Sequence, residues 1–429
     1  MGKNRRLLIG LLQSMTTMMI AAASLNNLTD KAALLTFKSR LLLDPGSVLA
    51  KNWSETSSHC SWVGVSCGRR HDRVIALVLP SMGLRGTIAG DIGNLSFLVF
   101  FAISGNSFYG HVPEELGRLR RLRGLFMNAN QLSGNIPATF GLLTNLRFLN
   151  MAENHLTGNV PREIGNLSAL QQLSLRWNNL TGNIWSEFEN LSSLQILSLH
   201  SNNFTGTIPA SIANLSNLDM FDIGHNSING NIPSELGQLP NLKEIYLSFN
   251  SFEGEFPRPP LNISGLQTIA LVGNSFSGNF PPNLAFKLPN IEGIFLASNN
   301  FSGNIPPSIS NASKLVYLDL GRNFLSGYIP TTLGNLDHLL FLNLQFNQLG
   351  NDPSSPELGF LASLIKLKHL QTLQIGGNPL NGTFPRFFPD GNLSMSLTEF
   401  LAGGSGIRGQ IPIEIGNLTK LIWLGIDNN

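Results

Sequence analysis

The sequence predicts an α/β solenoid, a fold in which one short structural unit stacks repeatedly on the next. Within each period a short run of alternating apolar residues precedes, in most copies, a Gly and a Pro. An asparagine also recurs at a fixed step of 24 residues, at Asn106, Asn130, Asn154, Asn178, Asn202, Asn226, Asn250 and Asn274. Such strict spacing over so many copies is typical of repeats that each form one structural unit.

The copy from Leu146 to Leu170 reads LRFLNMAENHLTGNVPREIGNLSAL. The alternation around Leu149 and Met151 predicts a short strand with one apolar face. Gly158 and Pro161 are expected to turn the chain, because Gly permits positive φ and Pro fixes φ. A looser, polar, convex return should follow. The residues expected to point inward are Leu146, Leu149, Met151, Leu156, Val160, Ile164 and Leu167.

One repeat alone cannot offset the conformational entropy lost on folding, so the repeats must cover one another in a stack of parallel strands. The recurring asparagine suits that stack, because its amide both donates and accepts hydrogen bonds. Backbone groups that leave the strand need such a partner when they are buried. We therefore interpret the asparagine column as structural rather than as a ligand site.

The repeat resembles the plant-type extracellular leucine-rich repeat, whose distinguishing segment is LxGxIP. Copies of that segment are LSGNIP (Leu132 to Pro137), FTGTIP (Phe204 to Pro209), INGNIP (Ile228 to Pro233), FSGNIP (Phe301 to Pro306) and LSGYIP (Leu325 to Pro330). The resemblance implies a curved right-handed superhelix with a parallel sheet on its concave face and an N-terminal helical cap. It covers almost everything from about residue 25 onward.

Several positions depart from the repeat pattern. Met82 and Ser405 stand at the asparagine position, and Trp185 replaces the expected Pro. The step also lengthens to 31 residues between Asn347 and Asn378. We expect the additional segment, Gly350 to Leu358, to be a short loop on the convex side. It is either a tolerated surface insertion or a functional island.

The chain is divided into residues 1–24, 25–72 and 73–429. The first segment has a basic start, an apolar stretch and small residues near its end, which predicts a secretory signal peptide rather than a membrane span. The last is expected to hold about 14 to 15 repeats. Because Asn429 falls at the asparagine position of an unfinished repeat, we expect a partial chain, with more repeats, a cap and a membrane span downstream.

Residues 25–72 are expected to form the N-terminal cap. Thr29 and Asp30 precede KAALLTFKSRLL, which predicts an amphipathic helix with an acceptor cap at its start. Trp53, Trp62 and the two cysteines follow. In a secreted chain, Cys60 and Cys67 favour a local disulfide over a reactive thiol. The resemblance supports the same pairing.

Composition and motifs argue against catalysis and against nucleic acid. Charged residues make up 13% of the chain and the net charge is +2, too balanced for binding to nucleic acid or a membrane surface. Gly404 to Gly409 matches GxGxxG, but PIEIG follows where the dinucleotide motif needs a helix. The histidines are scattered and lack metal-binding spacing. We expect no catalytic residue, no metal and no cofactor.

Sequons of the form Asn-x-Ser/Thr are frequent and avoid the strand positions expected on the concave face. Asn27 and Asn52 carry the motif near the N-terminus. The glycosylation candidates within the repeats are Asn94, Asn166, Asn179, Asn190, Asn203, Asn214, Asn262, Asn300, Asn311, Asn381, Asn392 and Asn417. The concave face is therefore expected to stay free of sugar.

The variable strand positions should form columns on the concave face, with neighbouring rungs about 4.8 Å apart. One expected column of exposed residues is Ala102, Phe126, Asn150, Ser174, Ser198, Asp222, Tyr246, Ala270, Phe295, Asp319 and Asn343. Aromatic, cationic and anionic residues gather in the middle of the array, and such side chains dominate binding energy at interfaces. The ligand-binding candidates are Arg176, Trp177, His200, Asp222, His225, Tyr246 and Phe249. The alternative is that they are ordinary solvated sheet residues.

The segments from Ser355 to Pro385 and from Ser396 to Leu421 resemble ectodomains of plant leucine-rich repeat receptor-like serine/threonine kinases, especially the subfamily that includes sensors of bacterial peptides. The resemblance implies a peptide or protein ligand, a co-receptor kinase ectodomain as partner, and a downstream membrane span and kinase. It places the chain in the secretory pathway and then at the outer face of the plasma membrane or in the apoplast, in immune or developmental signalling. A secreted hydrolase inhibitor similar to polygalacturonase-inhibiting proteins, and a receptor-like protein without a kinase, are the alternatives.

Overall fold

A computed structural model describes residues 28–183, 186–255, 263–352, 354–386, 388, 393 and 395–429. The chain forms two compact units, one ending at Ile196 and the other running from Leu197 to Asn429, so the boundary falls within strand β12 (Ile196–Ser198). The expected signal peptide, Trp185 and the sequons at Asn27, Asn262 and Asn392 lie outside the described residues. None of the helices in the described part of the chain has the length and hydrophobicity that a membrane span needs.

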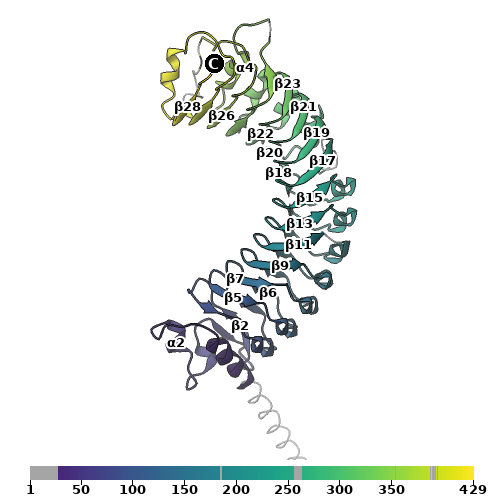
Figure 1. Ribbon diagram of the computed structural model, residues 1–429, viewed down its shortest axis with the longest axis vertical. Helices are drawn as coiled ribbons and strands as arrows, with labels where there is room; N and C mark the ends of the chain where they lie inside the picture. Colours follow the sequence, from purple (N-terminus) through teal and green to yellow (C-terminus); the bar gives the residue numbers. More distant parts are fainter. Residues whose placement is uncertain are drawn as a thin grey trace, which may run out of the picture. The chain divides into compact units, whose positions relative to one another are not determined.

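The first unit begins with the cap and continues as two sheets joined by short 3-10 helices (Figure 1). Its helices are residues 28–39, α2 (Val48–Asn52), η1 (His59–Ser61), η2 (Gly90–Asn94), η3 (Glu114–Arg118), η4 (Ala138–Leu142), η5 (Arg162–Asn166) and η6 (Ser186–Asn190). The first sheet contains β1 (Val65–Cys67), antiparallel to β2 (Val74–Val78), and then the parallel strands β4 (Phe100–Ala102), β6 (Gly124–Phe126), β8 (Phe148–Asn150) and β10 (Gln172–Ser174). The second contains β3 (Arg85–Gly86), β5 (Ser107–His111), β7 (Gln131–Gly134), β9 (His155–Asn159) and β11 (Asn179–Asn183).

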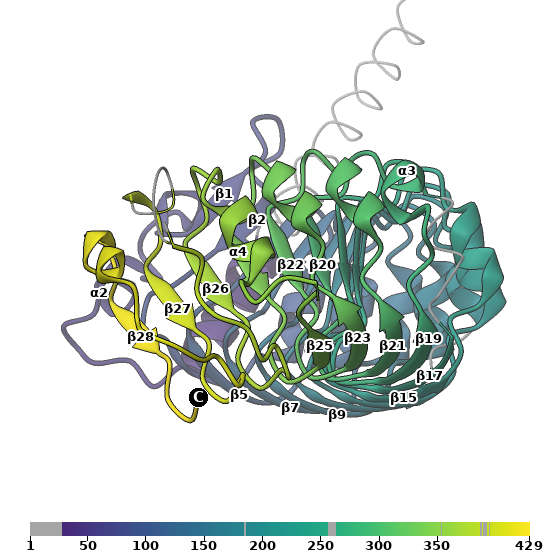
Figure 2. The same cartoon turned by 90° about the horizontal axis from the view of Figure 1, so that it is seen from above.

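The second unit repeats the same plan. Its first sheet contains β14 (Met220–Asp222), β16 (Glu244–Tyr246), β18 (Thr268–Ala270), β20 (Gly293–Phe295), β22 (Tyr317–Asp319), β24 (Phe341–Asn343), β26 (Thr372–Gln374), β27 (Glu399–Leu401) and β28 (Trp423–Gly425). Its second sheet, whose strands lie side by side in Figure 2, contains β13 (Asn203–Gly206), β15 (Ser227–Gly230), β17 (Ser251–Glu255), β19 (Ser275–Asn279), β21 (Asn300–Asn304), β23 (Phe324–Tyr328) and β25 (Gln348–Gly350). Its helices are η7 (Ala210–Asn214), η8 (Ser234–Gln238), α3 (Leu284–Lys287), η10 (Pro307–Asn311), η11 (Thr331–Asn335), α4 (Gly359–Leu364) and η13 (Ile413–Asn417).

The apolar residues predicted to point inward are buried. In the copy that begins at Leu146, all seven of them are at most 2% exposed. The predicted parallel strand is also confirmed, because β8 pairs in register with β6 on one side and β10 on the other. Burial between neighbouring repeats therefore forms the core, as the period requires.

The return segment was predicted wrongly. Gly158 does not turn the chain but lies within β9 of a second parallel sheet, with φ of 73°. Glycine suits this position because such a positive φ is one that other residues rarely adopt. Pro161 then precedes a regular 3-10 helix, η5, rather than a loose return. The sequence pattern for this second strand was weak because Leu156 is the one buried side chain of β9.

The asparagine column satisfies buried backbone groups, as predicted. Asn154 Nδ2 donates to the carbonyl oxygens of Met127, Met151 and Ala152 at 3.0–3.1 Å, and its Oδ1 accepts from the Leu132 amide at 3.0 Å. Asn154 thus gives the Leu132 amide an acceptor and adds a donor to three carbonyls, which also accept from Asn130, Asn178 and the Ala129 amide. At one departure from the pattern, the hydroxyl of the buried Ser405 replaces part of this set by donating to the Ile375 carbonyl.

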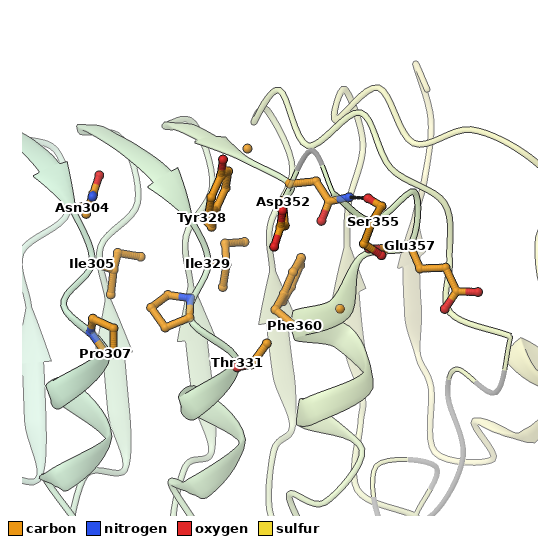
Figure 3. Close-up of a pocket in the computed structure, with 14 residues that line it drawn as sticks. Asn304, Ile305, Pro307, Tyr328, Ile329, Thr331, Asp352, Ser355, Glu357 and Phe360 are labelled. Atoms are coloured by element: carbon orange, nitrogen blue, oxygen red, sulfur yellow. Dashed lines mark hydrogen bonds between the residues drawn. The ribbon is translucent and has the colours of Figure 1, made fainter.

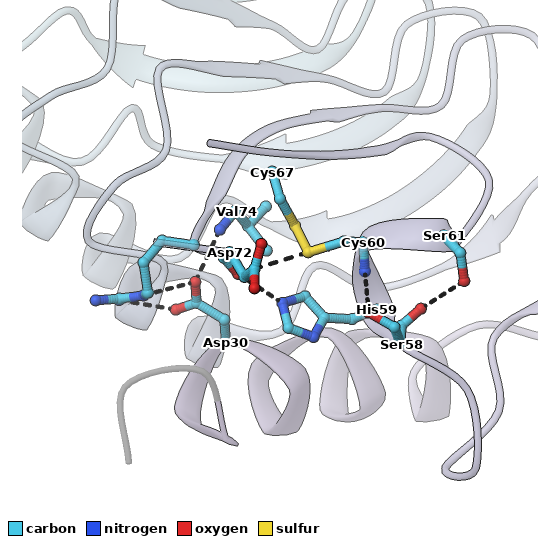
Figure 4. Close-up of a disulfide and its surroundings, with 9 residues drawn as sticks. Asp30, Ser58, His59, Cys60, Ser61, Cys67, Asp72 and Val74 are labelled. Atoms are coloured by element: carbon cyan, nitrogen blue, oxygen red, sulfur yellow. Dashed lines mark hydrogen bonds and ion pairs between the residues drawn. A yellow bond between two sulfur atoms is a disulfide. The ribbon is translucent and has the colours of Figure 1, made fainter. Parts of the chain in front are cut away.

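The N-terminal cap is closed by the predicted disulfide and by a buried ion pair (Figure 4). Cys60 and Cys67 are joined, with an S–S distance of 1.99 Å. Asp30 does not cap the helix as expected. Its carboxylate is buried within the helix and accepts two hydrogen bonds from Arg73, each 2.9 Å, and a third from the Val74 amide. Three donors and an opposite charge compensate for the loss of water around Asp30.

The tryptophans of the cap pack under the first repeat. Trp53 and Trp62 stack with ring centroids 5.1 Å apart, and both are buried. Their ring nitrogens donate to the Val63 carbonyl and the Ser57 hydroxyl, so burial leaves neither indole N–H unpaired. His59 lies beside the two cysteines, but their sulfur atoms form the disulfide and are not available as thiolate metal ligands.

Candidate functional site

The binding candidates predicted from the sequence divide between the two units. Arg176 and Trp177 follow β10 in the first unit, where both are exposed and the Arg176 guanidinium lies 3.1 Å from the Glu153 carboxylate. The other five, from His200 to Phe249, belong to the second unit. In that unit they lie on the solvent face of the first sheet and on the turns directly after it, which we call the strand face.

Asp222, the last residue of β14, lies at the buried end of this cluster. It was expected to be exposed, but it is only 8% exposed. Its two carboxylate oxygens accept from the Ser198 hydroxyl at 3.1 Å and from the Gly224 amide at 3.2 Å, and His200 Nδ1 lies 3.2 Å from Oδ1. The partners on neighbouring strands cover the short aspartate side chain. Asp222 therefore positions His200 more than it contacts solvent.

Three rings continue outward from Asp222 across successive repeats. The rings of His200 and His225 meet edge to face at 4.9 Å, and His225 lies 4.2 Å from the ring of Phe249. His225 and Phe249 are exposed. Although His225 is largely exposed, its partial burial is the largest cause that lowers its pKa; the neighbouring His200 lowers it further, and Asp222 opposes both effects. A neutral imidazole is thus favoured at His225, next to an aromatic face.

His225, Phe249 and Trp177 lie on turns and are not part of the predicted strand columns. All three occupy the turn position directly before the ladder asparagine, with φ of 52°, 56° and 56°. Gly273 has the same conformation one repeat after Phe249, and a Cβ on Gly273 would meet the Phe249 ring at 2.7 Å. Left-handed backbone costs a bulky residue roughly 1–2 kcal/mol. His225, Phe249 and Trp177 adopt this strained backbone while their side chains project into solvent.

Tyr246 borders the cluster on the next strand. It is half-buried, and its hydroxyl donates to the Glu244 carboxylate at 3.0 Å. Burial, followed by the charge of Glu244, raises the pKa of Tyr246 to about 12. The column register is as predicted within this unit, since Asp222 pairs with Tyr246, Tyr246 with Ala270 and Ala270 with Phe295. The face combines stacking rings with hydrogen-bond donors and acceptors, which suits binding.

Sequence reasoning missed part of the strand face. It omitted Glu244, which fixes the Tyr246 hydroxyl, and a second ring on a turn, Phe346, which carries the Arg322 guanidinium 4.5 Å from its centroid. A Cβ on Gly377 would meet Phe346 at 2.6 Å, the same arrangement as Phe249 and Gly273. An aromatic residue before one ladder asparagine and a glycine before the next is therefore the signal that could have found it.

The sequons lie away from the strand face. Every glycosylation candidate that the structure describes is exposed. Most end a 3-10 helix, and others begin a second-sheet strand. The helix-end group is Asn94, Asn166, Asn190, Asn214, Asn311 and Asn417. The strand-start group is Asn179, Asn203 and Asn300. Asn381 lies on a turn, and Asn52 is partly covered because its side chain accepts from the Val63 amide.

Two family models match the sequence. One, described as a leucine-rich repeat region, matches residues 129–353, more than half of the chain. The other, described as a leucine rich repeat N-terminal domain, matches residues 27–68, which include the helix, the tryptophans and the disulfide of the cap.

Solved structures of plant receptors have a similar fold. A structure described as PEPR1–AtPEP1 superposes with a TM-score of 0.81 at 32% identity, covering 93% of this chain and 55% of that one. The Arabidopsis receptor kinase HAESA, solved with the peptide hormone IDA and the co-receptor SERK1, gives a TM-score of 0.73 at 28% identity, covering 91% of this chain and 68% of that one.

Shorter stretches match curated receptor kinases. The LRR receptor-like serine/threonine-protein kinase EFR of Arabidopsis thaliana is 42% identical over 95 residues, 22% of this chain and 9% of that protein. The receptor kinase-like protein Xa21 of Oryza sativa subsp. japonica is 49% identical over 82 residues, 18% of this chain and 8% of that protein. The matched stretches thus span less than a tenth of either relative.

Proposed function

Because this chain belongs to the leucine-rich repeat family, we propose that it is the ligand-binding ectodomain of a plant cell-surface receptor kinase. Peptides or proteins bind on the strand face of its second unit, around His200, His225 and Phe249. The observation that carries this proposal is the stack of three rings on a buried carboxylate, Asp222, with the outer two rings exposed. Rigid aromatic groups held by a sheet are effective anchors for a ligand.

The solved relatives support a polypeptide ligand. The receptor kinase HAESA, which is similar to this chain, was solved with a peptide hormone and the co-receptor SERK1, and another similar structure is described as PEPR1–AtPEP1. By this analogy the present ectodomain recruits a co-receptor kinase ectodomain when its ligand binds. The ligand acts by favouring the complex over the separate ectodomains.

The surface chemistry is consistent with an extracellular location. The cap carries a disulfide, a bond that persists in oxidising compartments. The described sequons within the repeats are exposed and lie outside the strand face, so glycans attached there would leave the ligand surface open. In this proposal the full-length protein also has a membrane span and a kinase, and it serves immune or developmental signalling, within the subfamily that includes sensors of bacterial peptides.

Binding selections with the secreted chain test the strand face. A phage-displayed library of random peptides is selected on the wild-type chain, and the enriched peptides are titrated against the double variant His225→Ala/Phe249→Ala. Because interface anchors dominate affinity, we expect a loss of about 10- to 100-fold. The matched control is His338→Ala/Phe286→Ala, which removes an exposed histidine from the turn after η11 and an exposed phenylalanine from α3.

The result that overturns the proposal is a set of enriched peptides whose affinity is the same for the wild type and the strand-face variant. Circular dichroism and the melting temperature of each variant establish that it is folded. Digestion with a glycosidase and mass spectrometry of the secreted chain test the sugars separately, and unmodified asparagines throughout would contradict glycosylation.

A further inference from the structure

The second unit contains a cavity on a different surface from the strand face. It lies in the crease, which we define as the strip between the end of each second-sheet strand and the helix that follows it. The cavity extends across the repeats that contain β21, β23 and β25, and its volume is about 410 Å³. That volume falls within the range of small-ligand and side-chain pockets.

The floor and walls of the cavity are apolar. Ile305, Ile329 and Phe360 are buried and come from three successive repeats, and Phe360 belongs to α4. Tyr328, at the end of β23, stands at the wall with about half of its surface exposed. An aromatic wall over an aliphatic floor favours a flat or extended apolar group.

The segment Gly350 to Leu358 supplies the polar edge. It is a loop, as expected from the sequence, which leads from β25 to α4 and lines the cavity. The segment is fixed at both ends: Asn351 Nδ2 donates to the Ser355 carbonyl, and the amides of Leu358 and Thr383 donate to the carbonyls of Thr383 and Pro356. The edge is therefore held by hydrogen bonds to the next repeat.

The charged side chains among the described residues that line the cavity are both acidic. Figure 3 shows the Asp352 carboxylate between Tyr328 and Phe360, whereas Glu357 points away from them. Asp352 accepts from the Ser354 hydroxyl at 2.7 Å and from the Ser354 amide at 2.9 Å. Both hydrogen bonds favour its ionised form and lower its pKa. A negative charge is thus fixed at one end of an apolar space.

We propose that this cavity is a second binding site, which takes the side chain of an arginine or lysine presented by a partner polypeptide. The aliphatic stem lies against Ile305, Ile329 and Tyr328, and the cationic end reaches Asp352. Long basic side chains combine these two properties, because they bury their stems while the charge stays near water. The exposed face of Tyr328 adds a cation–π contact. Glu357 contributes by its charge, at longer range.

A matched pair of small probes tests the charge recognition. Nα-acetyl-arginine methylamide and its neutral isostere, Nα-acetyl-citrulline methylamide, are titrated into the secreted chain by saturation-transfer NMR. We expect the arginine probe to bind about fivefold more tightly, the scale of an exposed charge pair. Asp352→Asn should reduce its affinity to that of the citrulline probe, and Glu357→Gln should have a smaller effect.

Asp337→Asn is the control, because it removes an exposed carboxylate from the turn after η11, outside the cavity. Tyr328→Ala should weaken both probes. Equal affinity of the two probes, no loss in Asp352→Asn, or the same loss in Asp337→Asn would each overturn the proposal. The melting temperature of every variant shows whether it is folded, so a variant that fails to fold is recognised.

The polypeptide nature of the occupant has its own test. Acetyl-Ile-Arg-Ile-amide should bind more tightly than the single arginine probe, because its neighbours cover the apolar floor. If spermidine binds as tightly as this tripeptide, a small polyamine rather than a polypeptide occupies the cavity, and the proposal is wrong. The variants at Asp352, Glu357 and Tyr328 change the cavity and leave the strand-face residues in place, so this site and the proposed receptor function can fail independently.

Discussion

The crease of the first unit and the crease of the second unit are built from the same repeat but have different surfaces. In the first unit Ile136 and Val160 are accompanied by three asparagines, two glycines and the basic Arg162, and no aromatic residue is among the described lining residues. In the second unit Tyr328, Phe360 and Asp352 form an apolar cavity with a negative edge. The difference coincides with the step of 31 rather than 24 residues between Asn347 and Asn378. A longer return segment changes the crease without changing the strands.

The ladder itself is unaffected by the longer step. Asn378 Nδ2 donates to the carbonyls of Leu344, Ile375 and Gly376, and its Oδ1 accepts from the Leu349 amide, just as Asn154 does in a regular repeat. The hydrogen bonds connect the ends of strands, and the insertion lies beyond β25. A repeat can thus acquire a new surface where its backbone ladder does not depend on chain length.

The largest expected effect tests whether the asparagine hydrogen bonds stabilise the fold equally in a regular repeat and in the longer one. Asn154→Ala and Asn378→Ala each remove three hydrogen bonds to backbone carbonyls and the acceptor of one buried amide, so we expect each to lower the free energy of unfolding by about 3 kcal/mol. Urea-induced unfolding of the secreted chain measures both. If Asn378→Ala costs less than half as much as Asn154→Ala, the insertion has relaxed the ladder and the comparison fails.

A smaller effect distinguishes the backbone of the two creases. Gly158→Ala places a Cβ 2.4 Å from Asn135 Oδ1 at a left-handed φ of 73°, so it should destabilise the chain by about 1–2 kcal/mol. Gly350→Ala has no positive φ and no atom closer than 3.8 Å, so its effect should stay within about 0.5 kcal/mol. Melting temperatures of the two variants, measured side by side, would contradict this if they shifted equally.

The smallest expected effect concerns the charge at the cavity edge. Ser354→Ala removes the hydroxyl that is the largest cause of the lowered pKa of Asp352, so that pKa should rise toward its ordinary value of 3.8. A lowered pKa stabilises the fold above the unfolded pKa, and this contribution is lost as the pH falls through the folded pKa. NMR titration of the Asp352 carboxyl between pH 2 and 6 measures the change. An unaltered pKa would mean that Ser354 does not hold the carboxylate.

The sequence predicted the repeat, the inward residues and the role of the asparagines because each follows from local spacing. Leu149 and Asn154 recur at a fixed step, and any stack that buries the first must also satisfy the buried backbone near the second. The cap disulfide was anticipated by a resemblance together with the spacing of Cys60 and Cys67. The second sheet was missed because β9 contributes a single buried side chain.

The surfaces were decided by the tertiary structure. The strand pattern predicts that Asp222 is exposed. In the structure it is buried by partners from the neighbouring repeat, which are distant in sequence. Asp30 reads as a helix cap, yet Arg73 lies across from it only after the cap folds onto the first repeat. Periodicity is encoded within one repeat and can be read from the chain. Contacts of charged and aromatic groups depend on which repeats become neighbours, and only folding establishes their distances.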